Sequence, residues 1–123
     1  MVTKKQLGDE AEARALRHLL DHGLVLEQAN YRVAGGPFSR GGEIDLVMRE
    51  RDGTLVFVEV RARADAAHGG AAASIGSAKR RRLVYAAQCY LMRLATPPPC
   101  RFDVVVFDGE RVEWLRGAFD AGP

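Results

Sequence analysis

Apolar residues recur with helical spacing in two parts of the chain. One helix is predicted from about residue 4 to residue 22, closed by Gly23. Its expected core-facing stripe is Leu7, Ala11, Ala15, Leu16, Leu19 and Leu20. A second helix is predicted from Ser77, whose side chain can cap it, to about Leu94. Its expected core face is Leu83, Ala87, Tyr90, Leu91 and Leu94.

Short apolar runs between and after these helices predict strands. The predicted strands cover residues 24–33, 42–48, 55–63, 101–107 and 111–116. Glycine-rich residues 34–42 and the Ala- and Gly-rich residues 65–75 are expected to be flexible connections, and Asp108-Gly109 to be the last turn. Residues 34–42 lack the Gly-Lys-Ser/Thr ending of a phosphate-binding loop, which argues against a nucleotide site there.

The order of elements limits the topology. Helix, three strands, helix and two strands include one strand-helix-strand unit, which implies a parallel, right-handed connection. The fold class expected is therefore α/β, with a mixed central sheet flanked by helices. The 123 residues are 47% hydrophobic and 28% charged, which is typical of one globular domain over residues 1–123.

Acidic residues interrupt two of the strands where a sheet normally buries Val and Ile. Glu43 and Asp45 lie on the strand over residues 42–48, and Glu59 on the strand over residues 55–63. An ionised carboxylate in a low-dielectric core is strongly disfavoured unless a cation pairs with it. A divalent metal ion or an arginine could supply that charge.

The turn between these strands sets their expected register. Residues 51–53 end in Gly53 and read as a three-residue hairpin loop with the glycine in a left-handed conformation. The facing pairs that follow are Glu50 with Thr54, Asp45 with Glu59 and Glu43 with Arg61, all on one face. The other face is then apolar and expected on the core: Ile44, Leu46, Met48, Val56, Val58 and Val60.

This register makes Asp45 and Glu59 a candidate metal site, because facing like charges repel unless a cation lies between them. Two alternatives remain open. A two-residue turn would shift the pairing by one and place Asp45 opposite Val60. The charges could also lie on the solvated face of a hairpin, with Arg61 pairing with Glu43.

Glu12 lies at the inner edge of the apolar stripe of the first predicted helix. From this position it could reach the acidic strands. An ordinary salt bridge with Arg or Lys is an equally good interpretation.

A basic run, residues 79–82, opens the second predicted helix, where the helix dipole disfavours positive charge. Helix N-terminal amides together with Lys and Arg suit a phosphate group. The run, Lys79, Arg80, Arg81 and Arg82, is therefore interpreted as a contact with a nucleic-acid backbone in preference to a solvated basic turn.

Charge is unevenly distributed although the formal net charge is only +2. From Arg61 to Arg93 there are seven Lys or Arg residues and a single acid, Asp65. Cys89 and Cys100 have no metal-type spacing, which suggests a reducing compartment. No apolar stretch is long enough to span a bilayer, so a cytoplasmic protein without a membrane partner is expected.

Six segments together resemble the YraN-like predicted endonucleases of bacteria, a family similar to archaeal Holliday junction resolvases within the restriction-endonuclease-like superfamily. The segments span almost the whole chain, and their order is more specific than any one of them. They are residues 8–12 (GDEAE), 30–32 (NYR), 42–46 (GEIDL), 57–63 (FVEVRAR), 79–83 (KRRRL) and 101–105 (RFDVV).

The resemblance implies a restriction-endonuclease-like core and metal-dependent cleavage of DNA, with branched or single-stranded DNA as suggested substrates and a homodimer as a suggested assembly. The superfamily site maps residue by residue onto Glu12, Asp45, Glu59 and Arg61. Asp45, Glu59, the Val60 carbonyl and Glu12 would hold Mg²⁺ or Mn²⁺, and Arg63 would join the basic run in contacting DNA. Arg61 stands where the superfamily has lysine, and arginine cannot act as a base.

Overall fold

The computed structural model describes residues 3–37, 40–63 and 75–120. Its elements are α1 (Lys4–Asp21), β1 (Val25–Val33), β2 (Gly42–Arg49), β3 (Leu55–Arg63), α2 (Ser77–Leu91), β4 (Cys100–Asp108) and β5 (Arg111–Phe119). This is the predicted order of elements. The predicted connection over residues 65–75 lies outside the described residues, apart from Ile75.

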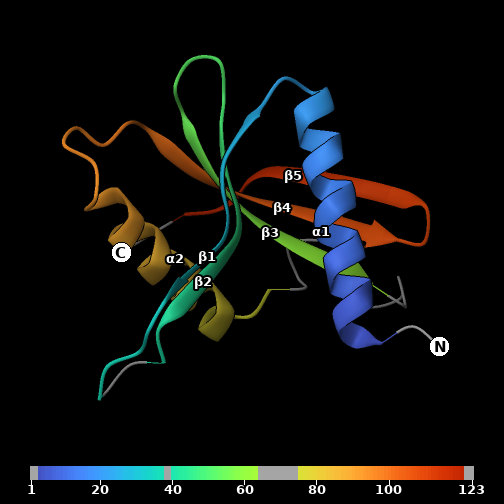
Figure 1. The fold of residues 1–123 in the computed structure, drawn as a ribbon, viewed down its shortest axis with the longest axis horizontal. Coiled ribbons are helices and arrows are strands. Elements are labelled where there is room, and N and C mark those ends of the chain that lie inside the picture. Colours follow the sequence, from blue (N-terminus) through green and yellow to red (C-terminus); the bar gives the residue numbers. More distant parts are fainter. Residues whose placement is uncertain (1–2, 38–39, 64–74, 121–123) are drawn as a thin grey trace.

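All five strands form one sheet in the order β1-β2-β3-β4-β5 (Figure 1). Strands β3 and β4 are parallel and joined through α2, whereas the other neighbours are antiparallel. The predicted mixed sheet and its single parallel connection are confirmed.

The two helices cover different faces of this sheet, and each face has its own apolar core (Figure 1). One core packs α1 against the sheet through Ala11, Ala15, Leu19, Leu46, Met48, Val56, Val58, Val105 and Phe107. The other packs α2 against the sheet through Leu83, Ala86, Ala87, Tyr90, Val47, Leu55, Phe57, Phe102, Val104 and Val106. Strand β3 is therefore buried on both faces, which accounts for its nearly continuous apolar sequence.

Details of both helices differ from the prediction. Leu7 and Leu20 are 50% and 46% exposed, so the buried stripe of α1 is narrower than its apolar pattern suggested. Gly76, not Ser77, is the N-cap of α2, and no side chain caps this end. Helix α2 ends at Leu91, and Leu94 packs against the core from beyond it.

The hairpin of β2 and β3 has the predicted register near its turn. The Glu50 N–H donates to the Thr54 carbonyl at 2.9 Å, and Gly53 has φ +94°. Paired residues run from Arg49 with Leu55 to Leu46 with Val58. The alternative two-residue turn is thereby excluded.

Regular strand geometry breaks beyond Leu46. Ile44 packs in the core under α2, whereas Leu46 and Met48 face α1, so the expectation that all three share a face was wrong. The break lies at Asp45 and at its β1 neighbour Asn30, which has φ +54°.

None of the described helices is long and apolar enough to cross a membrane.

Candidate functional site

The Asp45 side chain occupies the gap where β2 and β3 stop pairing. Continued pairing would place the Val60 N–H against the carbonyl of Ile44. The Val60 N–H instead donates to Asp45 Oδ2 at 2.8 Å. A residue's N–H and C=O point to the same neighbouring strand, so the Val60 carbonyl also faces this gap.

Glu59 is the charged residue most deeply placed beside Asp45. Its residue exposure is only 4%, and the neighbouring Asp45 carboxyl group contributes to the rise in the pKa of Glu59. Glu59 Oε2 is buried without a well-aligned hydrogen bond, and Lys79 Nζ lies 3.3 Å from it. The predicted adjacency of Asp45 and Glu59 is therefore present in the structure.

The Glu59 carboxyl group is buried and lies next to that of Asp45. Burial and then the adjacent Asp45 raise the pKa of Glu59 from its ordinary 4.5 to about 9, and Lys79 only partly opposes them. Near neutral pH the Glu59 carboxyl group therefore keeps its proton. A cation bound beside Glu59 would favour loss of this proton, because a nearby opposite charge stabilises the ionised carboxylate.

Glu12 approaches the same pair from α1. Burial and the Asp45 carboxylate raise the pKa of Glu12, while a hydrogen bond from the Asn30 side chain opposes the increase. Asn30 lies opposite Asp45 in the register of β1 with β2, between pairs Ala29–Leu46 and Tyr31–Ile44. Three elements, α1, β1 and β2, thus direct polar side chains towards one place.

The fit of a metal ion depends on the donors in this gap. Among the described residues, no group of three or more His, Cys, Asp or Glu side chains is arranged to hold one. Glu12 therefore does not complete a three-carboxylate shell with Asp45 and Glu59 in this structure. Mg²⁺ commonly binds through one or two carboxylates and several waters. Asp45, Glu59 with its unbonded Oε2, and the Val60 carbonyl fit that simpler donor set.

Lys79, and not Arg61, is the cationic residue that forms an ion pair with Glu59 among the described side chains. In the described part of the chain Glu43 forms ion pairs with Arg32 at 3.4 Å and Lys79 at 3.7 Å. No ion pair joins Glu43 to Arg61 among these residues, so that predicted alternative was wrong. The ladder that would have brought them together ends at Leu46.

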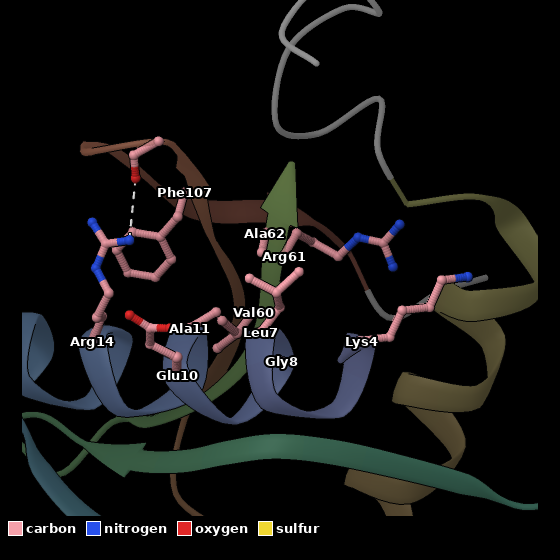
Figure 2. Close-up of a pocket in the computed structure, with 11 residues that line it drawn as sticks. Lys4, Leu7, Gly8, Glu10, Ala11, Arg14, Val60, Arg61, Ala62 and Phe107 are labelled. Atoms are coloured by element: carbon pink, nitrogen blue, oxygen red, sulfur yellow. Dashed lines mark hydrogen bonds between the residues drawn. The ribbon is translucent and has the colours of Figure 1, made fainter. Parts of the chain in front are cut away.

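Arg61 instead lines a cavity of about 800 Å³ between α1 and the ends of β3 and β4 (Figure 2). The cavity contains three cationic side chains, those of Lys4, Arg14 and Arg61. Lys4 and Arg61 lie at one end and Arg14 at the other. The cavity adjoins the carboxylate gap through Val60, which precedes Arg61 on β3.

The predicted basic run does not form a single surface. Lys79 is directed to the carboxylates, and Arg80 lies over the Phe119 ring at 5.2 Å. Arg81 is exposed, and Arg82 is half-buried. Arg82 lines a second cavity, of about 330 Å³, with Arg32, Val33, Arg40, Gly42 and Glu43. The predicted nucleic-acid contact at Arg63 lies outside the described side chains.

Close packing at Gly42 fixes how α2 approaches the site. A Cβ atom on Gly42 would lie 2.2 Å from the Arg82 carbonyl oxygen. Only glycine allows the start of β2 to lie this close to the helix that carries Lys79.

The sequence alone did not predict that Asn30 lies beside Glu12, that Arg14 lines the cavity or that Lys79 meets Glu59. One signal was available for Asn30, because asparagine is among the residues that most readily adopt positive φ within a strand. The positions of Arg14 and Lys79 depend on how the helices pack. No local pattern reports that packing.

Residues 11–107 match the model of a family described as "Uncharacterised protein family UPF0102". A UPF0102 protein of Methylibium petroleiphilum is 65% identical over 98% of this chain and 99% of its own. UPF0102 proteins of Acidovorax sp. and Paracidovorax citrulli are each 60% identical, over 97% and 98% of this chain and 88% and 87% of their own. Over nearly its whole length, therefore, the chain belongs to the UPF0102 family.

Proposed function

We propose that this protein is a metal-dependent endonuclease that hydrolyses phosphodiester bonds in DNA. The observation that carries the proposal is the pair of neighbouring carboxyl groups of Asp45 and the buried Glu59, with Glu12 nearby and Lys79 Nζ 3.3 Å from Glu59. A purely structural sheet gains nothing from two facing carboxylates. Phosphodiester hydrolysis uses such groups.

Asp45, Glu59 and the Val60 carbonyl would hold Mg²⁺ or Mn²⁺. The ion would supply an activated water and neutralise charge on the phosphate. Asp45 is held in place by the Val60 N–H, so its carboxylate is oriented before any ligand arrives. Glu12 has a raised pKa and is oriented by Asn30, which suits a group that accepts and returns a proton near the attacking water.

Lys79 would stabilise negative charge on the phosphate. It lies beside Glu59 and is partly buried, so its ammonium group acts in a lower dielectric than bulk water. Arg61, one residue beyond Val60 and within the larger cavity, would bind a neighbouring phosphate. The loss of the superfamily's strand lysine is then compatible with catalysis.

A second candidate function follows from that substitution. A protein with arginine at position 61 could keep the fold and bind nucleic acid without cutting it. A third, from another class, is a protein-interaction module in DNA processing or uptake. The nuclease proposal includes a cytoplasmic location and a homodimeric assembly.

Incubation of purified protein with branched, single-stranded and supercoiled DNA, with Mn²⁺ and with EDTA, tests these alternatives. Metal-dependent cleavage that is lost in Glu59→Ala supports the nuclease. Binding that weakens with salt, without cleavage of any substrate, favours the non-catalytic domain. If the protein binds no DNA at low salt, only the interaction module remains.

Metal binding is tested separately by calorimetry with Mn²⁺. Wild-type protein should bind, and Asp45→Asn and Glu59→Gln should not. Unchanged binding in both variants would place the metal elsewhere and overturn the assignment of the site.

A further inference from the structure

The cavity of about 800 Å³ is lined by apolar and cationic side chains that play no part in the proposed cleavage step itself. Its walls are largely apolar, formed by Leu7, Ala11, Val60, Ala62 and Phe107. Leu7 is 50% exposed at its edge, although it belongs to the apolar stripe of α1. A mostly apolar hollow with a few charged groups at its edges has the composition of a small-molecule or nucleotide site.

Cations stand at both ends of this hollow (Figure 2). Arg14 is fixed, because it donates to the Gly109 carbonyl at 3.1 Å and its guanidinium lies 4.3 Å from the centre of the Phe107 ring. Lys4 and Arg61 extend at the other end. Among the described lining residues one carboxylate, that of Glu10, faces these three positive charges.

Apolar walls between separated cations match an unpaired nucleotide. Its base and sugar would occupy the walls, and its flanking phosphates would meet the cations. A base within an intact duplex is stacked and paired, so it could enter only by flipping out. The volume is within the range of pockets that hold molecules of nucleotide size.

The position of the hollow relates it to the candidate reaction centre. Val60 lines the hollow and donates its N–H to Asp45, and Ala11 lines it next to Glu12 on α1. The hollow and the candidate reaction centre therefore meet at Val60 on β3 and at the neighbouring positions 11 and 12 on α1.

We infer that this cavity binds an unpaired nucleotide of the DNA strand to be cut, so that single-stranded DNA and single-stranded tails are preferred to intact duplex. The inference rests on the proposed function for the identity of the ligand as DNA. Binding can nevertheless be measured without cleavage.

Gly8 provides a variant that fills the hollow without disturbing the core. It lines the hollow, and a Cβ atom added there would have nothing within 4 Å. Gly8→Leu should therefore fold and project into the space. Gly8→Ala is the matched control, because it adds only a methyl group at the same helical position.

The experiment measures binding of fluorescent oligonucleotides by anisotropy in EDTA, which prevents cleavage. Wild-type protein should bind a single strand at least tenfold more tightly than a blunt duplex of the same sequence, with a tailed duplex close to the single strand. Gly8→Leu should lose about tenfold for the single strand, and Gly8→Ala less than twofold. Arg14→Gln should weaken binding more than Arg51→Gln, a control at the hairpin turn away from the cavity.

Several outcomes would overturn the inference. Equal binding of duplex and single strand would do so, as would normal single-strand binding by a folded Gly8→Leu protein. Tighter binding of RNA than of DNA would assign a different ligand. A dimer that dissociates in Gly8→Leu, seen by light scattering, would assign the cavity to a second copy. Cleavage of duplex and single strands alike would leave the nuclease proposal standing while this inference fails.

Discussion

Asp45 accepts a hydrogen bond from the backbone N–H of Val60 at 2.8 Å, where the sheet would otherwise have continued between β2 and β3. One side chain therefore satisfies the backbone of the next strand and presents its carboxylate to Glu59. The two roles of Asp45 can be separated by substitution. An asparagine side chain still accepts the Val60 N–H, but it no longer carries a carboxylate.

Replacement of Asp45 should have two distinguishable effects. Asp45→Asn keeps an oxygen acceptor for Val60, so thermal stability should fall little, while metal binding and cleavage are lost. Asp45→Ala leaves the Val60 N–H without that acceptor and should cost about 1–3 kcal/mol in addition. Thermal denaturation and calorimetry with Mn²⁺ measure the two effects. Equal stability of the Asn and Ala proteins would argue against the structural role.

Glu59 should make the metal-free protein less stable as the pH rises. Its native pKa of about 9 lies above its ordinary 4.5, so the native state retains a proton that the unfolded chain releases. The stability linked to this proton is complete below about pH 4.5 and is lost as the pH approaches 9. Melting temperatures in EDTA from pH 5 to 9 should fall more steeply for wild type than for Glu59→Gln.

The matched control for Glu59 is Glu113→Gln, which changes an exposed carboxylate on β5. It should leave the pH dependence of the melting temperature unaltered. A Glu59→Gln protein with the same slope as wild type would contradict the buried, protonated state.

Lys79 should matter more for turnover than Arg61. Because Lys79 lies 3.3 Å from Glu59 and Arg61 lies in the adjoining cavity, Lys79→Gln should lower kcat roughly 100-fold. Arg61→Gln should mainly raise KM, and Arg61→Lys should alter kcat little. Arg81→Gln, an exposed neighbour on α2, is the control. A large fall in kcat with Arg61→Gln alone would instead give Arg61 the larger role in turnover.

Asn30 should position Glu12. Its backbone has φ +54°, which glycine adopts without strain, so Asn30→Gly should fold but lose the hydrogen bond to Glu12. Cleavage should then fall, and the pH–rate profile should shift to higher pH because that bond lowers the pKa of Glu12. Asn30→Val should instead lose about 1–2 kcal/mol of stability, because a β-branched residue is strained at this φ. An unchanged pH profile in Asn30→Gly would exclude the positioning role.

Gly42 and Gly8 form a contrasting pair. Gly42→Ala places a Cβ atom 2.2 Å from the Arg82 carbonyl oxygen and should cost about 1–3 kcal/mol, with displacement of the helix that carries Lys79. Gly8→Ala enters open space on α1 and should stabilise the protein by up to about 1 kcal/mol. Chemical denaturation of both variants measures the difference. A tolerated Gly42→Ala would show that β2 and α2 can separate without loss.

Much of the fold was predictable because it depends on local patterns. Apolar periodicity located both helices, and the turn at Gly53 set the register that brings Asp45 and Glu59 together. Patterns of this kind report only which side of an element is apolar. They did not show that Leu7 would remain exposed beside a cavity or that Ile44 would turn to the face under α2.

The sequence by itself determined the order of elements, the mixed sheet and the adjacency of two acidic strand residues, because short-range turn geometry and periodicity control these features. Only the tertiary structure decided which cation meets Glu59. Lys79 and Glu59 are separated by 19 intervening residues and meet because α2 crosses back over the sheet. Arg61 is only two residues from Glu59 in sequence, but it lines the neighbouring cavity. Pairing of β2 with β3 stops before this point, because Asp45 accepts the Val60 N–H.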